Sequence, residues 1–488
     1  PMLDNMKLMA TLAGLMKNKD KVKAAGDRIK DKAQAVRATG EAGGGAARAT
    51  VDGKMTVLSV ELSPALIGGM AADDKTRDLA GSLIAEAVNN ALRQAQQRMK
   101  AAIDEEAKAL GFEGGLPDVK GRPDLSTLHL APWEPDTAMV LFDWVWPDDS
   151  PCPFCPRSEL KRQLAQLNEL GYDARFALEL EFHILPTPIE KIRLGHWSTV
   201  ETVSKDVHCY SVYEGHFYEP LYRQIRQWFA DAVEGGGSEW GQGQFEITLK
   251  ASDPLAMADR VIAFKTAVKQ AAAGLGMSAT FMAKIHENMS GCSGHIHQSL
   301  VERGSGKPVF HDAKQPHNMA PVMQHYVAGL LDALIPSTLL FAPYANSYKR
   351  MKAETLAGTT ASWGIDNRTV GLRVINTDPG ACRVEHRIGG ADLNPYVAFS
   401  ACLGAGMRGI NKKLTLPPPS TGNAYRADVE TVPANLWTAL ALCDGSPITR
   451  EILSPQFVDN LMVVERLELV ALESFVTDVD RRRNFEMA

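Results

Sequence analysis

The sequence has 488 residues, a formal net charge of −6 and 23% charged residues. A chain of this length exceeds one ordinary hydrophobic core, so we expect two or more domains. The composition is that of a soluble globular protein and shows no overall bias toward nucleic acid.

No stretch of 18 uncharged apolar residues is present, and no signal peptide is recognisable. The seven cysteines are sparse and odd in number, which favours reduced thiols and a cytoplasmic location. Cys152 and Cys155 have C-x-x-C spacing without a second pair nearby. We therefore interpret them as part of a loop rather than as a zinc or redox site.

The composition changes sharply near residue 112. Every Phe, Tyr and Trp lies at or after Phe112, and Gly and Pro are frequent just beyond it. These features predict an N-terminal domain over 1–111, a linker over 112–124 and a second domain over 125–488.

The N-terminal domain is predicted to contain two helices. Residues 3–38 are rich in Ala, Lys, Met and Leu, which favour a helix, and a flexible Gly-rich stretch at 40–45 follows. Asp73 or Asp74 can cap a second long helix that ends near Leu110.

A β-hairpin is expected between these helices. Short β-prone runs at 46–51 and 54–62 flank Asp52-Gly53, which is a strong two-residue hairpin signal. A helix–hairpin–helix unit without aromatic residues buries little apolar surface by itself. We therefore expect it to dimerise.

Positive charge is concentrated on the first expected helix, with nine Lys or Arg and three Asp from Lys7 to Arg37. Such a stripe can contact phosphate, although a solvated helix face gives the same pattern. The order of elements, the Met/Lys-rich start and the Gly-rich entry to the hairpin resemble the small bacterial nucleoid-associated proteins of the YbaB type, over residues 2–111. The resemblance implies a dimer that binds DNA weakly without strong sequence preference, and association with the nucleoid.

The second domain begins with strands predicted at 124–133 and 137–144 and a helix at 158–170. The next strand, 176–185, is apolar except for Glu179 and Glu181, which the period of two places on one face. Carboxylates in an apolar run need a neutralising cation, so a metal site competes here with a solvent-facing strand edge.

Further candidate ligands follow along the chain. A helix predicted at 221–233 leads through three glycines to Glu239 and Glu246, which flank a Gly-rich turn. His295 and His297 share a face of another strand, and Ser299 joins them. A late group of cations suits bidentate recognition of phosphate and carboxylate and consists of Arg350, Arg368, Arg373, Arg383 and Arg387, with Glu385 among them.

The order of these motifs resembles glutamine synthetase over about 125–488. The resemblance is carried by the Glu-x-Glu and Gly-Gln-x-Glu motifs and by Asn346-Ser-Tyr-Lys-Arg350, Asn367-Arg368 and Arg383-x-Glu385-x-Arg387 followed by Asn394-Pro-Tyr. It implies ATP-dependent phosphorylation of the glutamate γ-carboxylate and displacement of phosphate by ammonia or an amine. It also implies an α+β fold with a curved antiparallel sheet and surrounding helices, in a ring oligomer with sites between subunits.

The resemblance assigns roles to individual residues. One Mg²⁺ or Mn²⁺ ion would lie on Glu181, Glu239 and Glu246, and a second on Glu179, His295 and Glu385. ATP contacts would be Glu234, His297, Ser299, Arg373 and Arg383. Glutamate contacts would be Gly291, Arg350, Arg368 and Arg387, of which the three arginines are the expected catalytic residues.

Three departures from the family concern the nitrogen substrate. The β-grasp segment that supplies an ammonium-binding aspartate is largely missing before residue 124. Leu356 stands where glutamine-forming members have a flap glutamate, and Ser290 replaces a glutamate-binding Asn. The Trp363-Gly-x-Asp-Asn-Arg-Thr sequence is similar to the branch that makes γ-glutamyl amides from organic amines.

We therefore predict an ATP- and metal-dependent ligase that forms a γ-glutamyl amide from glutamate and ammonia or an amine. The alternative is a catalytically weakened scaffold of the same fold with a DNA-binding or assembly role. The complete set of metal ligands favours the enzyme, and the missing β-grasp segment favours the scaffold.

Overall fold

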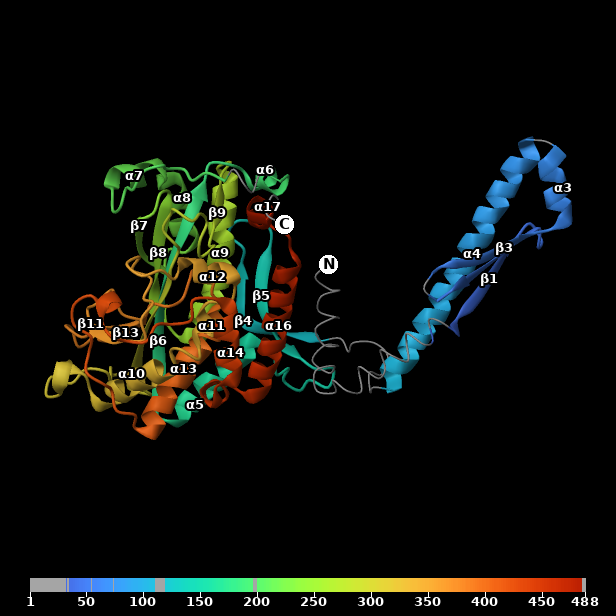
Figure 1. Ribbon diagram of the computed structural model, residues 1–488. Coiled ribbons are helices and arrows are strands. Elements are labelled where there is room, and N and C mark those ends of the chain that lie inside the picture. Colours follow the sequence, from blue (N-terminus) through green and yellow to red (C-terminus); the bar gives the residue numbers. More distant parts are fainter. Residues whose placement is uncertain are drawn as a thin grey trace. The chain divides into compact units, whose positions relative to one another are not determined.

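The computed structural model describes residues 32, 35–53, 55–72, 74–109, 119–195 and 200–484. The chain divides into two compact units, Pro1–Asp118 and Val119–Ala488, and each is described by itself (Figure 1). Of the helices that the structure describes, none combines the length and apolarity needed to cross a lipid bilayer.

The first unit is a three-stranded antiparallel sheet packed on a long helix. Its elements are β1 (Arg37–Ala42), β2 (Ala47–Asp52), β3 (Val57–Leu62), α3 (Pro64–Ala72) and α4 (Asp74–Ala109). Small residues fill the interface, which explains how a unit without aromatic residues forms a core. Gly40 is needed there, because a Cβ at this position would lie 2.3 Å from the Ala87 carbonyl oxygen of α4.

The sequence predictions for this unit need correction. The helix expected over 3–38 lies mostly outside the described residues, but its predicted end forms β1. The Gly-rich stretch at 40–45 is expected to be flexible. Its first residue, Gly40, instead belongs to strand β1 and is paired with Ala49 of β2. The burial of alternate β1 side chains, such as Ala38, against α4 therefore outweighs the helix propensity of this sequence.

The second unit is built on an eight-stranded sheet with the strand order β11-β12-β13-β10-β6-β8-β7, and β9 pairs with β6. All these pairs are antiparallel except β11 with β12. The strands are β6 (Tyr172–Leu185), β7 (Val233–Ser238), β8 (Gln244–Ser252), β9 (Ser278–Thr280), β10 (Gly294–Glu302), β11 (Trp363–Ile365), β12 (Leu372–Ile375) and β13 (Arg383–His386).

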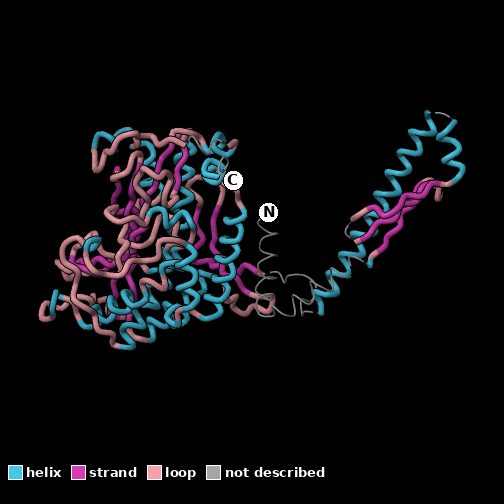
Figure 2. Tube along the Cα trace, viewed as in Figure 1, coloured by secondary structure: helices cyan, strands magenta, loops and turns pink. Residues whose placement is uncertain are grey.

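Helices accompany this sheet, as Figure 2 shows in cyan. They are α5 (Pro156–Glu169), α6 (Ile189–Arg193), α7 (Val212–Phe217), α8 (Glu219–Trp228), α9 (Pro254–Gly274), α10 (Pro321–Ala333), α11 (Thr338–Phe341), α12 (Ala345–Arg350), α13 (Pro395–Lys412), α14 (Leu436–Gly445), α15 (Pro447–Ile452), α16 (Pro455–Ser474) and α17 (Asp478–Asn484), with 3₁₀ turns η2 (Pro316–Asn318) and η3 (Ala424–Arg426). The helix predicted to reach residue 233 ends earlier, and the three glycines after it lie in β7.

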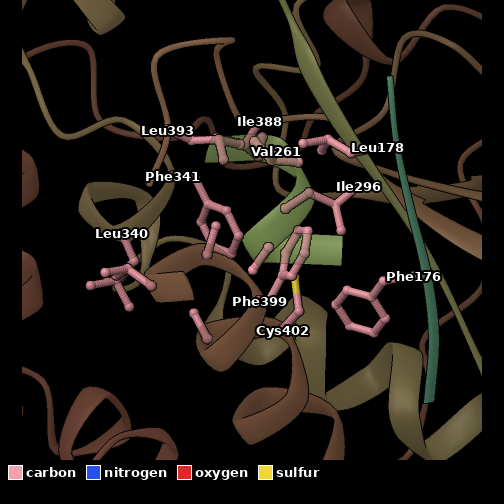
Figure 3. Packing of buried hydrophobic residues seen from close by; sticks show 14 of the residues in the cluster. Phe176, Leu178, Val261, Ile296, Leu340, Phe341, Ile388, Leu393, Phe399 and Cys402 are labelled. Carbon is pink, nitrogen blue, oxygen red and sulfur yellow. The ribbon is translucent and has the colours of Figure 1, made fainter. Parts of the chain in front are cut away.

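One face of the sheet forms the hydrophobic core. Phe176, Leu178 and Leu180 of β6 are fully buried, and Phe176 packs edge-on against Phe399 of α13 with ring centroids 5.0 Å apart (Figure 3). Alternation in a strand then directs the odd-numbered side chains of β6 to the opposite face. Glu179 and Glu181 therefore share the face that helix α13 does not cover.

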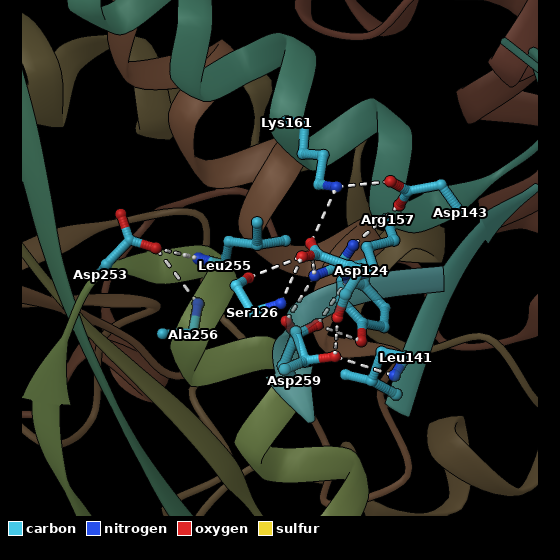
Figure 4. Close-up of polar contacts among 12 residues, drawn as sticks. Asp124, Ser126, Leu141, Asp143, Arg157, Lys161, Asp253, Leu255, Ala256 and Asp259 are labelled. Atoms are coloured by element: carbon cyan, nitrogen blue, oxygen red, sulfur yellow. Dashed lines mark hydrogen bonds and ion pairs between the residues drawn. The ribbon is translucent and has the colours of Figure 1, made fainter. Parts of the chain in front are cut away.

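Strands β4 (Lys120–Leu130) and β5 (Ala138–Val145) form a separate hairpin. Arg157 of α5 connects this hairpin to α9 through ion pairs. Its guanidinium lies 2.9 Å from Asp124 of β4, 2.9 Å from Asp143 of β5 and 2.8 Å from Asp259 of α9 (Figure 4). Lys161 also pairs with the two hairpin aspartates. β4 thus begins within the residues expected to form the linker.

Candidate active site

Strand register brings the candidate ligands together from four strands. Glu181 lies opposite Glu246 of β8, and Glu179 lies opposite His295 of β10. Across the next strand pair, His297 lies opposite Glu385 of β13. Residues separated by more than 200 positions therefore share one patch of the sheet.

Within this patch, Glu179 contacts both histidines. Its Oε2 lies 3.3 Å from His295 Nδ1, and its Oε1 lies 3.0 Å from His297 Nε2. Arg383 Nε lies 3.1 Å from His297 Nδ1, so the other ring nitrogen, Nε2, is the one that faces Glu179. His295 Nδ1 is also 3.4 Å from Glu385 Oε1.

Two sets of donor atoms are close enough to hold a metal ion. In each set the atoms lie within 4.8 Å of one another, and the sets are Glu179, Glu246 and His295, and Glu179, His297 and Glu385. His295 Nε2 is buried without a hydrogen-bond partner among the described residues. Carboxylate oxygens and imidazole nitrogens suit a hard or borderline divalent ion, so the donors fit a metal site.

This grouping differs from the two sets that the resemblance implied. Glu179 belongs to both groups, and His297, assigned to ATP, lies with the carboxylates. Glu181 lies outside both groups, and its Oε2 accepts from Ser293 N at 2.6 Å and from Gln244 Nε2 at 2.8 Å. Glu239 is not in either group, and its own Oε2 accepts from Trp240 N.

The electrostatics of the patch favour a bound cation. Burial, followed by repulsion from neighbouring carboxylates, raises the pKa of Glu246 to about 9. Burial likewise raises the pKa of Glu181 to about 7 and raises that of Glu239. Burial and the charge of Arg387 lower the pKa of His295 to about 4, which leaves a neutral imidazole able to bind metal.

Two arginines, the half-buried Arg373 and the buried Arg387, border the patch on the side of β12 and β13. Arg373 donates to Glu385 Oε2 at 3.0 Å, and Arg387 pairs with Glu385 Oε1. Glu385 is fully buried, so these two cations offset the cost of its desolvation.

Arg350 is held by the chain itself. It is 3% exposed and donates to the Ile388 carbonyl at 2.9 Å and to Ser293 Oγ at 2.8 Å. Gly291 allows this approach, because a Cβ there would lie 2.5 Å from the Arg350 side chain. These contacts fix the position of the Arg350 guanidinium beside Ser293.

The remaining candidates lie around the patch. Arg368 is exposed between β11 and β12 and acts electrostatically on Glu239. Ser299 is half-buried on β10, one strand period beyond His297. Glu234 and Arg383 line a pocket of about 850 Å³ that also reaches Glu179, Glu239 and Glu246.

Sequence reasoning missed two residues that position Glu181. Gln244 Nε2 bridges Glu181 and the Gly291 carbonyl, and Ser293 connects Glu181 to Arg350. For Gln244 a signal was available, since it lies two residues before Glu246 on the same face of β8. For Ser293 the sequence offered no comparable pattern.

Comparison with protein families decides the assignment, because residues 153–484 match the model of the glutamine synthetase catalytic domain. The chain belongs to the glutamine synthetase family. Residues 9–110 match the YbaB/EbfC DNA-binding family. Both resemblances expected from the sequence are thus confirmed.

Among similar members of the glutamine synthetase family, a glutamate–isopropylamine ligase from Pseudomonas sp is 37% identical over 383 residues, which are 77% of this chain and 83% of that protein. A gamma-glutamylethanolamide synthetase from Streptomyces coelicolor is 38% identical over 378 residues, covering 77% of this chain and 80% of that protein. A solved structure of GmaS without ligand superposes with a TM-score of 0.68 at 25% identity, over 75% of this chain and 85% of that chain.

Proposed function

We propose that this chain is an ATP-dependent ligase that joins the γ-carboxylate of glutamate to an amine. The observation that carries the proposal is the patch of Glu179, Glu246, His295, His297 and Glu385, bordered by a pocket of about 850 Å³ and by buried and half-buried arginines. Relatives that form γ-glutamyl amides from organic amines support it.

The chemistry follows from charge. Both the γ-phosphate of ATP and the attacking carboxylate are anionic, so their approach requires positive charge on both sides. Two Mg²⁺ or Mn²⁺ ions held by the carboxylates and imidazoles would supply Lewis-acid stabilisation of the transferring phosphoryl group. Arg373 and Arg383 border the phosphate side, and Arg368 is the exposed cation on the glutamate side.

The two steps balance without a protein nucleophile. A γ-carboxylate oxygen forms a bond to the γ-phosphorus, and ADP leaves. The amine nitrogen then bonds to the acyl carbon, phosphate leaves with the carboxylate oxygen, and the nitrogen loses a proton. The chain places these groups and limits the access of water to the acyl phosphate.

We propose that the nitrogen substrate is a small organic amine. Leu356, 47% exposed, occupies the loop after Arg350, and its carbonyl accepts from Arg387 at 3.1 Å. An apolar side chain at this position suits an alkyl group better than an ammonium ion, which needs a carboxylate partner.

Phosphate release from ATP and glutamate, measured across ammonium and a panel of small amines, tests this function. We expect a higher kcat/KM for at least one organic amine than for ammonium. An equal or higher kcat/KM with ammonium would instead indicate that the chain synthesises glutamine. No amine-dependent phosphate release with any substrate would favour the weakened scaffold.

For residues 9–110, the family match supports DNA binding as a second function of the same chain. We propose that this domain binds DNA without strong sequence preference, which would bring the enzyme to the nucleoid. A homo-oligomer would raise the avidity of such weak sites, and we propose a ring assembly on the family's pattern. The exposed Leu125, Leu130 and Phe142 of the β4–β5 hairpin provide apolar surface for subunit contact.

A further inference from the structure

Helix α12 contacts two loops of the proposed active site. The first loop, residues 283–293, leads into β10, and the second loop, residues 387–394, lies between β13 and α13. The two loops bond to each other directly, since Ala391 N donates to the Cys292 carbonyl at 3.0 Å. Both ends of the six-residue helix α12 in turn make hydrogen bonds to both loops.

At the start of α12, Asn346 is bonded to the first loop by both polar atoms of its side chain. Lys284 N donates to Asn346 Oδ1 at 3.0 Å, and Asn346 Nδ2 donates to the Lys284 carbonyl at 2.8 Å. The next residue, the buried Ser347, donates from Oγ to Asp392 Oδ2 of the second loop at 2.6 Å. Ser347 Oγ also accepts from Tyr344 N at the N-terminus of the helix. These bonds attach the first turn of α12 to both loops.

At the end of α12, Arg350 makes the same pair of connections. It donates to Ser293 Oγ of the first loop and to the Ile388 carbonyl of the second loop. Its side chain packs on Gly291, where a Cβ would lie 2.5 Å from Arg350 Cγ and 2.8 Å from the Ala283 carbonyl oxygen. Because this packing leaves no room for even one methyl group, a shift of the helix must move the first loop as well.

The helix and the two loops carry three of the four residues expected to contact glutamate. Gly291 lies on the first loop, Arg387 begins the second loop, and Arg350 ends α12. The Arg387 carbonyl also lies 3.3 Å from Arg350 Nη2. No residue of α12 lines the pocket of about 850 Å³. A displaced α12 should therefore disturb the glutamate side of the site more than that pocket.

We propose that Asn346 and Asp392 are positioning residues for glutamate, which act through α12 rather than on the substrate itself. By fixing α12 against both loops, they keep the three expected contacts in one common geometry. This inference rests on the proposed function and adds residues that set the glutamate site without forming it. Because the three contacts must act on one molecule together, a displacement of about 1 Å is enough to weaken binding strongly.

Isothermal titration of the full-length protein with L-glutamate, in saturating ADP and Mg²⁺, tests the proposal. In Asn346→Ala and in Asp392→Ala, we expect the Kd for glutamate to rise by about tenfold or more. The affinity for ADP, measured in the same way, should stay within about twofold. During turnover, the KM for glutamate should rise by a larger factor than that by which kcat falls.

Asp392→Asn is the conservative variant. Its side-chain oxygen can still accept from Ser347, and Asp392 Oδ1 has no hydrogen-bond partner among the described residues. The substitution therefore removes no hydrogen bond of the side chain, and we expect the glutamate affinity to stay within about twofold of that of the unmodified protein.

Asn435→Ala is the matched control for the loss of an asparagine side chain. Asn435 Oδ1 accepts from Thr438 N at 2.9 Å and caps α14, which carries none of the expected glutamate contacts. Its removal should destabilise the fold, as the loss of a helix cap does, and leave the glutamate affinity unchanged.

The outcomes separate this inference from the proposed function. Unchanged glutamate affinity in both alanine variants, with glutamate bound by the unmodified protein, overturns the inference alone. Equal losses of glutamate and ADP affinity would indicate a general distortion and also overturn it. Glutamate affinity that is lost equally in Asp392→Asn and Asp392→Ala would remove Asp392 from the proposal.

The unmodified protein gives the remaining two outcomes. Glutamate binding without amine-dependent phosphate release contradicts the ligase function and leaves the inference standing if the variants behave as expected. Absence of glutamate binding overturns both. If Asn346→Ala fails to fold, Asn346→Asp gives the same comparison, because it keeps the acceptor for Lys284 N and loses the donor to the Lys284 carbonyl.

Discussion

Glu179 and His297 meet across β6 and β10, with Oε1 and Nε2 3.0 Å apart. The register pairs His297 with Ala177 rather than with Glu179, so the contact is a diagonal one on a shared face. Glu179 is also the residue common to both groups of candidate metal ligands.

Because Glu179 serves both groups, its loss should affect metal binding more than the loss of any other single carboxylate. We expect Glu179→Gln to abolish most of the increase in melting temperature that Mn²⁺ produces. An ion at 100 times its Kd stabilises by about 2.7 kcal/mol, which is a readily measured shift. Glu169→Gln, at an exposed site on α5, should leave the shift intact, and an undiminished shift in Glu179→Gln would contradict the assignment.

The raised carboxylate pKa values predict how metal binding depends on pH. Glu181 and Glu246 bind protons more tightly in the folded chain, with pKa values of about 7 and about 9 against an ordinary 4.5. Their protonation stabilises the metal-free fold below pH 4.5, and this contribution is lost as the pH rises through those values. A metal ion bound at Glu246 must displace the proton of that carboxyl group.

We therefore expect the metal-free domain to lose stability from about pH 4.5 to about pH 9 and the stabilisation by Mg²⁺ to grow as the pH rises toward 9. Melting temperatures in EDTA and in excess Mg²⁺ at several pH values measure both trends. A Mg²⁺ effect that is constant or shrinks with rising pH would show that Glu246 does not bind the ion.

Removal of Arg157 should release the β4–β5 hairpin. Arg157→Leu leaves Asp124, Asp143 and Asp259 facing one another with Lys161 as the remaining cation, so we expect a loss of about 3–5 kcal/mol in unfolding free energy. Chemical denaturation measures this loss, and limited proteolysis should show earlier cleavage in the hairpin. Arg162→Leu, which removes a more exposed pair with Glu159, is the comparison, and similar losses in both variants would refute a special role for Arg157.

The N-terminal domain should confer salt-sensitive retention of DNA. In a gel-shift measurement, we expect the full-length protein to retard DNA of unrelated sequences at low salt. This binding should weaken steeply as the salt concentration rises, because it is driven by the release of counterions from the DNA. Deletion of residues 2–111 should remove retention while the second unit keeps its fold and assembly. A deletion variant that falls apart, with intact protein that never retards DNA, would instead make assembly the role of this domain.

How much the sequence could predict depends on whether a feature is local. Alternation along β6 is a local property, and it correctly separates Glu179 and Glu181 from the buried Leu178 and Leu180. The pairing of β6 with β10 is not local, so the contact of His297 with Glu179 could not be read from spacing. The order of the motifs predicted the family. It could not predict which candidate metal ligands lie opposite one another in the sheet.

The wrong predictions have similar causes. Arg37 and Ala38 follow a run of residues that favour a helix, yet they belong to strand β1 because Ala38 is buried against α4. Glycine usually indicates a loop, yet Gly235–Gly237 form β7 because pairing with β8 satisfies the backbone and the pocket needs no side chains there. In both cases distant contacts outweigh local propensity.

The transfer of oxygen from glutamate to phosphate tests the proposed reaction most directly. With glutamate labelled by oxygen-18 in its γ-carboxylate, ATP, Mg²⁺ and the best amine, phosphate released during turnover is analysed by mass spectrometry. Reaction through γ-glutamyl phosphate predicts that one labelled oxygen appears in each phosphate formed together with the amide. Amide formation that yields unlabelled phosphate would contradict the proposed mechanism.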